Sequence, residues 1–466
     1  MNPLPPDADA TPQPPAEPPT APKPATPAPA TPKPATTGPA ATEPATTGPS
    51  TTRPATAGPS TTRPAATAHT APAPTVPVVR TAVLLLAYFA FISLGLPDGL
   101  LGVGWPSMAT EFRVGTDAVG LLLFAGTAGY LVSSVAAGFS IARLGVGLLL
   151  AGSTALASLA LTGYAVSPAF AFLVPCALIA GFGGGAIDAG LNAYAAGAFG
   201  PKHMNWLHAF FGLGVAIGPL IMTGVLSGGL SWHWGYGIVA SGQALLAIAF
   251  AVSARSWAQH GARDPAAAPG DDRPPAATRI AVTLAIPAVW LSAAAFAVYV
   301  ALEITAGLWA FLYLTDGRGI SAAVAGICVS AYWASLFVGR VVQGFIVERI
   351  GTTRILVGSL FGLLAGSVLV ALPGPGWLAV AGLMVIGFAA APVFPLLTLT
   401  TKDRVGAEHA DRTIGVQIGA SGLGGALIPA GVGVLIDRVG EQALGPSLVV
   451  LSLLLLGLYA LTQRRH

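Results

Sequence analysis

Charged side chains are scarce in this sequence. Of its 466 residues, 9% are charged and 54% are hydrophobic, and the mean hydropathy is +0.72. This number of charges is too small to cover the surface of a water-soluble protein of this length. The composition therefore indicates an integral membrane protein. The net charge of +3 is spread over loops, which gives no reason to expect a nucleic-acid partner.

Cysteine is almost absent as well. Cys176 and Cys328 both lie in apolar segments far apart in sequence, which excludes a disulfide framework and favours two small packing residues. The sequence also lacks a Walker A motif, H-E-x-x-H and G-x-S-x-G. We therefore expect no metal, no cofactor and no enzymatic activity.

Residues 1–78 lack any apolar run that could bury surface. They consist mainly of Pro, Ala, Thr and Gly in imperfect repeats, which predicts a disordered, partly polyproline tail. The tail has no basic region followed by an apolar one, so it does not resemble a cleavable signal peptide. It is either a cytoplasmic spacer or a dispensable extension.

Long apolar segments separated by short polar joints follow the tail. Segments of roughly 20 residues match the thickness of a bilayer, and they predict an all-α membrane protein with twelve transmembrane helices. One long polar segment, residues 255–279, divides them into two six-helix bundles, 79–254 and 280–466, joined by a cytoplasmic linker. The predicted spans are 81–106, 117–141, 146–166, 169–198, 205–228, 233–254, 281–314, 321–343, 353–371, 376–399, 413–436 and 444–462.

Lys and Arg are distributed unevenly between the two sides that these spans define. Outside the tail, Arg113, Arg318 and Arg438 fall on one side, Arg340 lies within a span, and all the others fall on the opposite side. Cytoplasmic loops are enriched in Lys and Arg, so we expect both termini in the cytoplasm and the protein in the cell membrane. We expect a monomer surrounded by lipid.

The two halves repeat each other. The segment that begins at Gly138 (GFSIARLG) returns 206 residues later as GFIVERIG, with Gly, Phe, Arg and Gly in the same places. An offset of 205 carries Asp98 onto Glu303. Such repeats are common in secondary transporters, whose binding sites lie between the halves near the membrane midplane.

These paired loops on a six-plus-six plan resemble the major facilitator superfamily. In that family such loops form cytoplasmic charge contacts that help to set the inward-facing and outward-facing states. The resemblance assigns this role to Arg143, Glu348, Arg349 and Arg354. The first loop departs from the pattern, because Ala142 stands where an acid is usual.

A narrower resemblance lies between residues 181 and 219. Asp188 followed by Asn192, then Asn205 and the run LHAFFG, resembles the fucose permease branch of sugar:proton symporters. Asp98 also matches an acid of that branch, although the fucose permease has Glu where this chain has Asp188. The resemblance implies a sugar or a related polyol as the substrate.

Three acids lie well inside predicted spans, namely Asp98, Asp188 and Glu303. A charge at the centre of a membrane helix costs roughly 2.5–3.5 kcal/mol on insertion scales, so such acids usually have a function. Helical spacing places each on a face with small residues that lets a second helix approach closely. The three faces consist of Gly181, Gly185, Asp188 and Asn192; of Gly95, Asp98 and Gly102; and of Tyr299, Glu303 and Gly307.

We interpret these acids as proton-coupling residues. A carboxyl that meets water from alternate sides can take a proton on one side and release it on the other, and linkage then couples the proton to a solute. Polar groups would hold the hydroxyls of the solute and aromatic rings its apolar faces. The candidates are Asn192, Asn205, His208, Tyr299, Trp309, Trp333 and Gln417.

Structural alternatives remain for each acid. Asp188 could tie two helices through Asn205 or His208, and Asp98 could lie near the membrane interface. Glu303 could form a buried ion pair with Arg340. His208 could lie at headgroup level.

The leading hypothesis is therefore a proton-coupled importer of a small polar solute. The alternative is a proton-coupled exporter of drugs or metabolites, because Gly214, Gly218 and Pro219 have the G-x-x-x-G-P form found in proton-driven exporters. A receptor, an enzyme or a channel fits the sequence less well, since there is no folded soluble domain or catalytic motif and the halves repeat.

Overall fold

The computed structural model describes residues 81–199, 201–257 and 280–463. All of them belong to one structural unit, Pro74–His466, and the elements that they form are helices. The expected tail, 1–78, and all but three residues of the expected linker, 255–279, lie outside the described residues. The predicted division into four regions therefore stays a prediction.

The first half is built from five long helices joined by short turns. Apolar residues fill each of them for more than twenty residues, so each can cross a bilayer. The elements are α1 (Thr81–Phe112), η1 (Thr116–Ala118), α2 (Val119–Ala165), α3 (Phe170–Ala198), α4 (Pro201–Ser227), α5 (His233–Ser253) and η2 (Ala254–Trp257).

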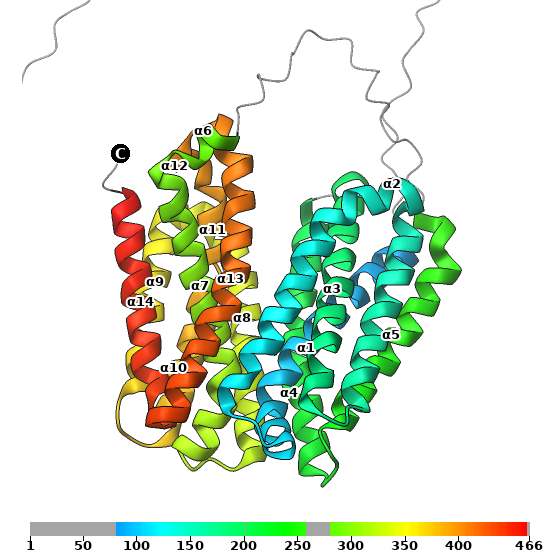
Figure 1. The fold of residues 1–466 in the computed structure, drawn as a ribbon. Coiled ribbons are helices and arrows are strands. Elements are labelled where there is room, and N and C mark those ends of the chain that lie inside the picture. Colours follow the sequence, from blue (N-terminus) through cyan, green and yellow to red (C-terminus); the bar gives the residue numbers. More distant parts are fainter. Residues whose placement is uncertain (1–80, 200, 258–279, 464–466) are drawn as a thin grey trace, which may run out of the picture. The chain divides into compact units, whose positions relative to one another are not determined.

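Helix α2 contains two of the predicted spans, 117–141 and 146–166. Its 47 residues would extend about 70 Å if straight, more than twice the apolar thickness of a bilayer. Gly145 interrupts the helical backbone with φ +74° and ψ 161°, a conformation that suits glycine. The chain reverses there, so α2 crosses the membrane twice (Figure 1).

The second half contains shorter helices because proline interrupts two of its spans. The predicted span 281–314 breaks before Pro287, and the predicted span 376–399 breaks at Ala391 and Pro392. The elements are α6 (Ile280–Leu284), α7 (Pro287–Leu312), η3 (Tyr313–Gly317), α8 (Ala322–Ile350), α9 (Thr352–Ala371), α10 (Gly376–Ala390), α11 (Val393–Leu399), α12 (Thr401–Val405), α13 (Ala407–Val439), η4 (Glu441–Ala443) and α14 (Leu444–Gln463).

In the described residues, eleven helical stretches are long and apolar enough to span a membrane. The double crossing of α2 brings the number of passes to twelve, as the sequence predicts. Successive passes alternate in direction, so Thr81, Gly145, η2, α6 and α12 lie at the same end of the unit (Figure 1). We call this the linker end and the opposite end the far end.

Glycines allow the helices of the first half to pack closely. A Cβ on Gly214 would overlap the carbonyl oxygen of Ile92, and one on Gly218 would lie 2.6 Å from the carbonyl oxygen of Leu96. The G-x-x-x-G-P segment of α4 therefore packs against α1. In the same way, a Cβ on Gly185 of α3 would overlap the Tyr130 carbonyl of α2.

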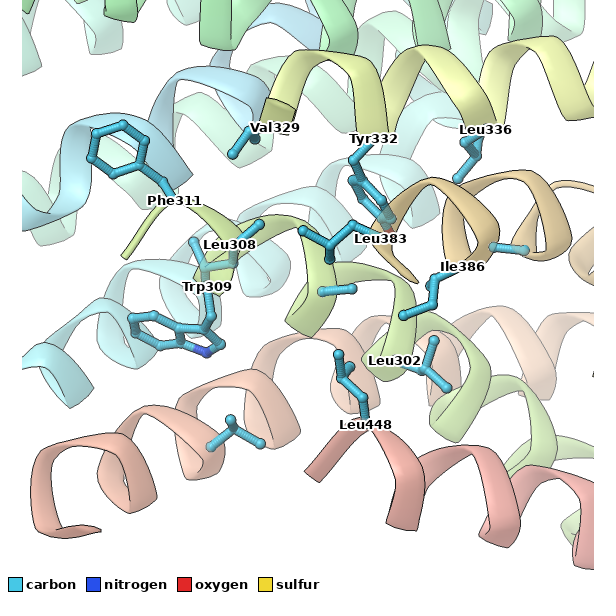
Figure 2. Packing of buried hydrophobic residues seen from close by; sticks show 14 of the residues in the cluster. Leu302, Leu308, Trp309, Phe311, Val329, Tyr332, Leu336, Leu383, Ile386 and Leu448 are labelled. Carbon is cyan, nitrogen blue, oxygen red and sulfur yellow. The ribbon is translucent and has the colours of Figure 1, made fainter. Parts of the chain in front are cut away.

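The hydrophobic core of the second half surrounds α7. Leu302 of α7, Tyr332 of α8 and Leu383 and Ile386 of α10 are all buried to within 1% and lie together where the three helices meet (Figure 2). Helix α7 also packs against α13 and α14. This central position explains why nearly four fifths of its apolar window is buried.

The two halves meet through α4 and α8, α2 and α13, and α1 and α7. The close approaches lie in the far-end portions of these helices. A Cβ on Gly102 would lie 3.1 Å from the Gly307 carbonyl oxygen, and one on Gly326 would overlap Thr223. Ser330 donates a hydrogen bond of 2.6 Å to the Ala216 carbonyl across the same boundary. Any solute that passes between the halves must separate these contacts.

Candidate functional site

Asp188 lies on α3 and is held by two hydrogen-bond donors of its own half. The Tyr130 hydroxyl of α2 donates to Oδ2 at 2.6 Å, and the Asn192 side-chain amide donates to Oδ1 at 2.9 Å. Both carboxylate oxygens therefore have a partner. The spacing of Asp188 and Asn192 placed them correctly on one face, and Tyr130 completes the cluster from a neighbouring helix.

Asp98 lies in the middle of α1, and its side chain is exposed. Gly99 beside it packs so closely on α4 that a Cβ would overlap the Val215 carbonyl. Among the described residues Asp98 has no hydrogen bond or ion pair, but its charge acts on Tyr130. It thus lies within electrostatic reach of the Asp188 cluster.

Glu303 lies on α7 at the place equivalent to Asp98. Its carboxyl is hydrogen-bonded to the Tyr299 hydroxyl, one helical turn away on the same face, as the spacing predicts. Tyr299 also lies 2.9 Å from the Ala390 carbonyl, where α10 ends. The Tyr332 hydroxyl of α8 donates to the backbone carbonyl of Glu303 at 2.8 Å.

His208 and Arg340 belong to opposite halves and link Asp188 to Glu303 electrostatically. His208 of α4 interacts electrostatically with both Asp188 and Arg340, and Arg340 of α8 also acts on Glu303. A Cβ on Gly212 of α4 would lie 4.0 Å from Arg340 Nη1. Charged and titratable groups of both halves therefore interact across this boundary.

The buried ion pair between Glu303 and Arg340, the structural alternative for Glu303, is not formed. The ion pairs between described residues join His233 to Glu111 and His409 to Glu408. Arg340 is half-buried and makes no hydrogen bond within the described part of the chain. Its guanidinium is thus available to a ligand, which the sequence analysis did not foresee.

Two of the predicted solute-binding residues, Trp309 and Gln417, lie elsewhere. Trp309 is 1% exposed and donates to the Pro429 carbonyl at 3.0 Å, and Gln417 is fully buried and hydrogen-bonded to Thr401. The side chain of Asn205 lies outside the described ones. Trp333 is half-buried on α8, and a Cβ on Gly307 of α7 would overlap its indole.

The predicted charge loops lie at the linker end and are exposed. Arg143 lies over the Phe139 ring, with 4.0 Å from its guanidinium carbon to the ring centroid. Glu348, Arg349 and Arg354 are exposed, and no ion pair joins them in the described ranges. Their role in setting conformational states stays a prediction.

Asp437 forms a contact between the halves that the sequence did not reveal. Its carboxylate accepts hydrogen bonds from the backbone N–H groups of Thr116 and Asp117 at 3.2 and 3.1 Å. These groups lead into α2, so a carboxylate of the second half caps a helix of the first. Beside it is a cavity of about 510 Å³ whose lining includes Trp105, Arg113, Asp316, Asp437 and Glu441.

Arg404 is a second feature that sequence reasoning missed. It is 7% exposed in α12, and its guanidinium donates to neutral oxygens, those of Ser292, Thr400, Thr401 and Leu397. Burial lowers the pKa of Arg404 below its usual value. Its donors fasten α12 to α7 and α11 at the linker end, a structural role.

Comparisons with known proteins agree with this architecture. The Major Facilitator Superfamily model matches residues 87–429. The chain is similar to Bypass of stop codon protein 6 of Saccharomyces cerevisiae (strain ATCC 204508 / S288c), with 23% identity over 399 residues and 79% of each chain covered.

Solved structures of several transporters share the fold. One is the nucleoside transporter NupG, with TM-score 0.67, 14% identity and coverage of 83% of this chain and 99% of that chain. Another is a bacterial homolog of the human lysosomal transporter Spinster in an inward-facing, occupied conformation, with TM-score 0.66, 15% identity and coverage of 83% and 97%. The peptide transporter POT in complex with sulfate gives TM-score 0.63 at 15% identity and coverage of 82% and 95%. Since the family model spans most of both halves, the chain belongs to the Major Facilitator Superfamily and is a membrane transporter rather than an enzyme.

Proposed function

We propose that this transporter takes up a sugar or a similar small polar solute together with protons, by alternating access between its two halves. One observation carries the proposal. Asp188 is held by Tyr130 and Asn192 in an apolar helix and interacts with His208, which in turn interacts with Arg340 of the other half. An ionisable group in such a place usually has a function, which supports a coupling role for Asp188.

Asp188 is the main coupling residue in this proposal. A proton bound there would neutralise the carboxylate and change what the neighbouring amide and hydroxyls can offer to a solute. If the solute binds well only to one protonation state, the two fluxes are coupled by linkage. Asp98 and Glu303, at equivalent places in the two halves, are the further coupling residues.

Polar groups from both halves would bind the solute. Asn192 and His208 come from the first half, Tyr299 and Arg340 from the second, and Trp333 offers an aromatic face. NupG is a nucleoside transporter, and a nucleoside also carries sugar hydroxyls, which is compatible with a polyhydroxylated solute. Trp309 and Gln417 are buried here and are retained as candidates only for a different conformation, and Asn205 stays a candidate.

The contacts between the halves support an inward-facing state. The closest approaches and the Asp437 cap lie toward the far end, and the Lys and Arg distribution assigns the linker end to the cytoplasm. In this orientation both termini are cytoplasmic, in the cell membrane. The chain functions as a monomer, because each monomer contains both halves.

Export by proton antiport is the competing function. The segment that suggested it, Gly214 to Pro219, is explained by close packing of α4 on α1. No contact of the described residues favours export.

Solute-induced proton movement in reconstituted vesicles tests the proposal. A panel of sugars and polyols is added outside vesicles that contain the full-length protein, with lipophilic cations as a second panel. Symport predicts alkalinisation of the external medium on addition of one of the polar solutes. Proton release driven by the cations, with no response to any polar solute, would establish export instead.

A further inference from the structure

The Tyr299 hydroxyl lies between two hydrogen-bond acceptors. On one side is the carboxyl of Glu303, and on the other, at 2.9 Å, is the backbone carbonyl of Ala390. A phenol has one proton and can donate one hydrogen bond, but its oxygen can also accept. Tyr299 therefore cannot donate to an ionised Glu303 and to Ala390 at the same time.

The Ala390 carbonyl lies where its helix is interrupted. In a continuous helix it would accept from the N–H of Phe394, four residues later. Helix α10 ends at Ala390 and α11 begins at Val393, and Pro392 between them has no N–H to donate. Ala390 is fully buried, so the Tyr299 hydroxyl is a donor that water does not replace at this carbonyl.

Only one arrangement of protons places a hydrogen atom in both contacts of the Tyr299 oxygen. If Glu303 is a neutral acid, its O–H donates to the Tyr299 oxygen, and Tyr299 donates to Ala390. We propose that Glu303 is protonated in this conformation and that Tyr299 relays its hydrogen bond to the break between α10 and α11. Tyr299 is then a positioning residue that connects the protonation of Glu303 on α7 to the conformation of the break between α10 and α11.

The other groups that face Glu303 do not change this conclusion. Arg340 favours the ionised form through its positive charge, but the two side chains form no ion pair in the described part of the chain. The Tyr332 hydroxyl is occupied by the backbone carbonyl of Glu303. From the remaining helices packed on α7, no charged side chain among the described residues acts on this carboxyl.

Release of the proton would reverse the relay. The O–H bond of Glu303 breaks, its electron pair stays on the carboxylate, and the proton passes to water. Tyr299 then donates to the carboxylate, so the Ala390 carbonyl loses its hydroxyl donor and depends on the Phe394 N–H, four residues later. The two helices would draw together across the break, and Arg340 would gain an anionic partner.

Movement at this break would be felt on α7. The Phe394 ring lies 5.2 Å from the Phe296 ring and 6.4 Å from the Tyr299 ring, between centroids. Any change in the first turn of α11 therefore shifts side chains on the helix that carries Glu303. The relay rests on the proposed function only for its consequence in transport, since the protonation of Glu303 can be measured without a solute.

Infrared spectroscopy of the full-length protein in lipid nanodiscs at neutral pH tests the protonation directly. The carboxylic-acid C=O band of Glu303 should be present in the wild type and lost in Glu303→Gln, which keeps the shape and can still donate to Tyr299. Tyr299→Phe should shift the band, because the acid loses its acceptor. Tyr332→Phe removes a hydroxyl from the same surroundings and should leave it in place.

The proposal is overturned if Glu303→Gln leaves the acid bands of the wild type unchanged, because Glu303 is then ionised. Equal shifts in Tyr299→Phe and Tyr332→Phe would also overturn the relay. These spectra do not depend on transport, so a failure of proton-coupled uptake would leave them as expected.

Hydrogen–deuterium exchange at the Phe394 amide tests the connection to the break. Raising the pH until the acid band disappears should slow this exchange, once corrected for the intrinsic effect of pH, because the amide becomes hydrogen-bonded. Glu303→Gln should abolish the slowing. Slowing of the same size in Glu303→Gln would show that the break does not respond to this carboxyl.

Discussion

The two halves differ in the hydrogen-bond partners of their membrane acids. In the first half, Asp188 receives one hydrogen bond from Tyr130 and another from Asn192, an arrangement that suits an ionised carboxylate. In the second half, Glu303 shares its single tyrosine with the Ala390 carbonyl. The difference teaches that similar Tyr–acid pairs in the two halves meet different hydrogen-bond partners.

The repeat explains how this asymmetry is built. The place equivalent to Asp188 in the second half is occupied by Phe394 (188 + 206), which lies just after the break between α10 and α11. The first half has a continuous helix with a carboxylate, where the second half has a broken helix whose end carbonyl meets the Tyr299 hydroxyl. The proposed coupling at Asp188 and the proposed relay at Glu303 would thus both follow from one divergence.

The largest expected effect comes from Asp188→Asn. The amide fills the same volume but cannot bind and release a proton, so accumulation of the solute against a gradient should be abolished while exchange at equilibrium persists. Uptake and counterflow in reconstituted vesicles measure the two activities. Asp403→Asn, at an exposed acid outside the spans, should accumulate solute normally.

If Asp188→Asn accumulated solute like the wild type, Asp188 would be a structural tie between helices. The comparison between the halves would then reduce to a difference in packing. The Glu303 relay, measured spectroscopically, would be unaffected.

A smaller effect is expected from Gly326→Ala, which should weaken the contact between the two halves. The new methyl group would overlap Thr223 across the boundary, and overpacking typically costs about 1–3 kcal/mol. This cost should destabilise the conformation in which the halves touch at the far end, relative to the conformation in which they have separated there. The matched control is Gly344→Ala on the same helix, where a Cβ meets nothing within 4 Å.

Cysteine labelling measures this shift. A single cysteine at Thr110, which lines the far-end cavity, should react faster with a maleimide in Gly326→Ala, in a background with Cys176 and Cys328 replaced by alanine. Equal rates in Gly326→Ala and Gly344→Ala would show that the halves do not open at this contact.

The smallest effect is expected from Asp437→Asn. Loss of the charge weakens the cap on the helix of the other half by about 0.5–1 kcal/mol, so labelling at Thr110 should rise a few-fold. Glu441→Gln neutralises an acid of the same cavity whose side chain has no hydrogen bond within the described residues. A rise of the same size in Glu441→Gln would mean that general charge, and not the cap, joins the halves.

Much of the fold could be predicted from the sequence, because bilayer thickness and hydropathy determine the spans. The face shared by Asp188 and Asn192 followed from helical spacing alone. Tyr130 did not, since a single sequence does not say which residues of two neighbouring helices face each other. Trp309 and Gln417 have side chains typical of binding sites, but close packing, which no spacing reveals, encloses them.

The acceptor at Ala390 shows a different limit. It is a backbone atom, so no side chain announces it, and Pro392 and Pro395 indicate only that the helix is interrupted nearby. The partner that uses the freed carbonyl comes from another helix. Sites built on broken helices can therefore be located from prolines, but their partners require the structure.

The reversal at Gly145 has a mechanical consequence. The two limbs of α2 are joined by one residue with positive φ, so they form a tight helical hairpin. The first limb touches α13 of the other half at Gly120 and Ala430, and Ser158 of the second limb donates to the Ala240 carbonyl of α5. The hairpin thus connects the boundary between the halves to α5, and a tilt of the first limb should move α5 with it.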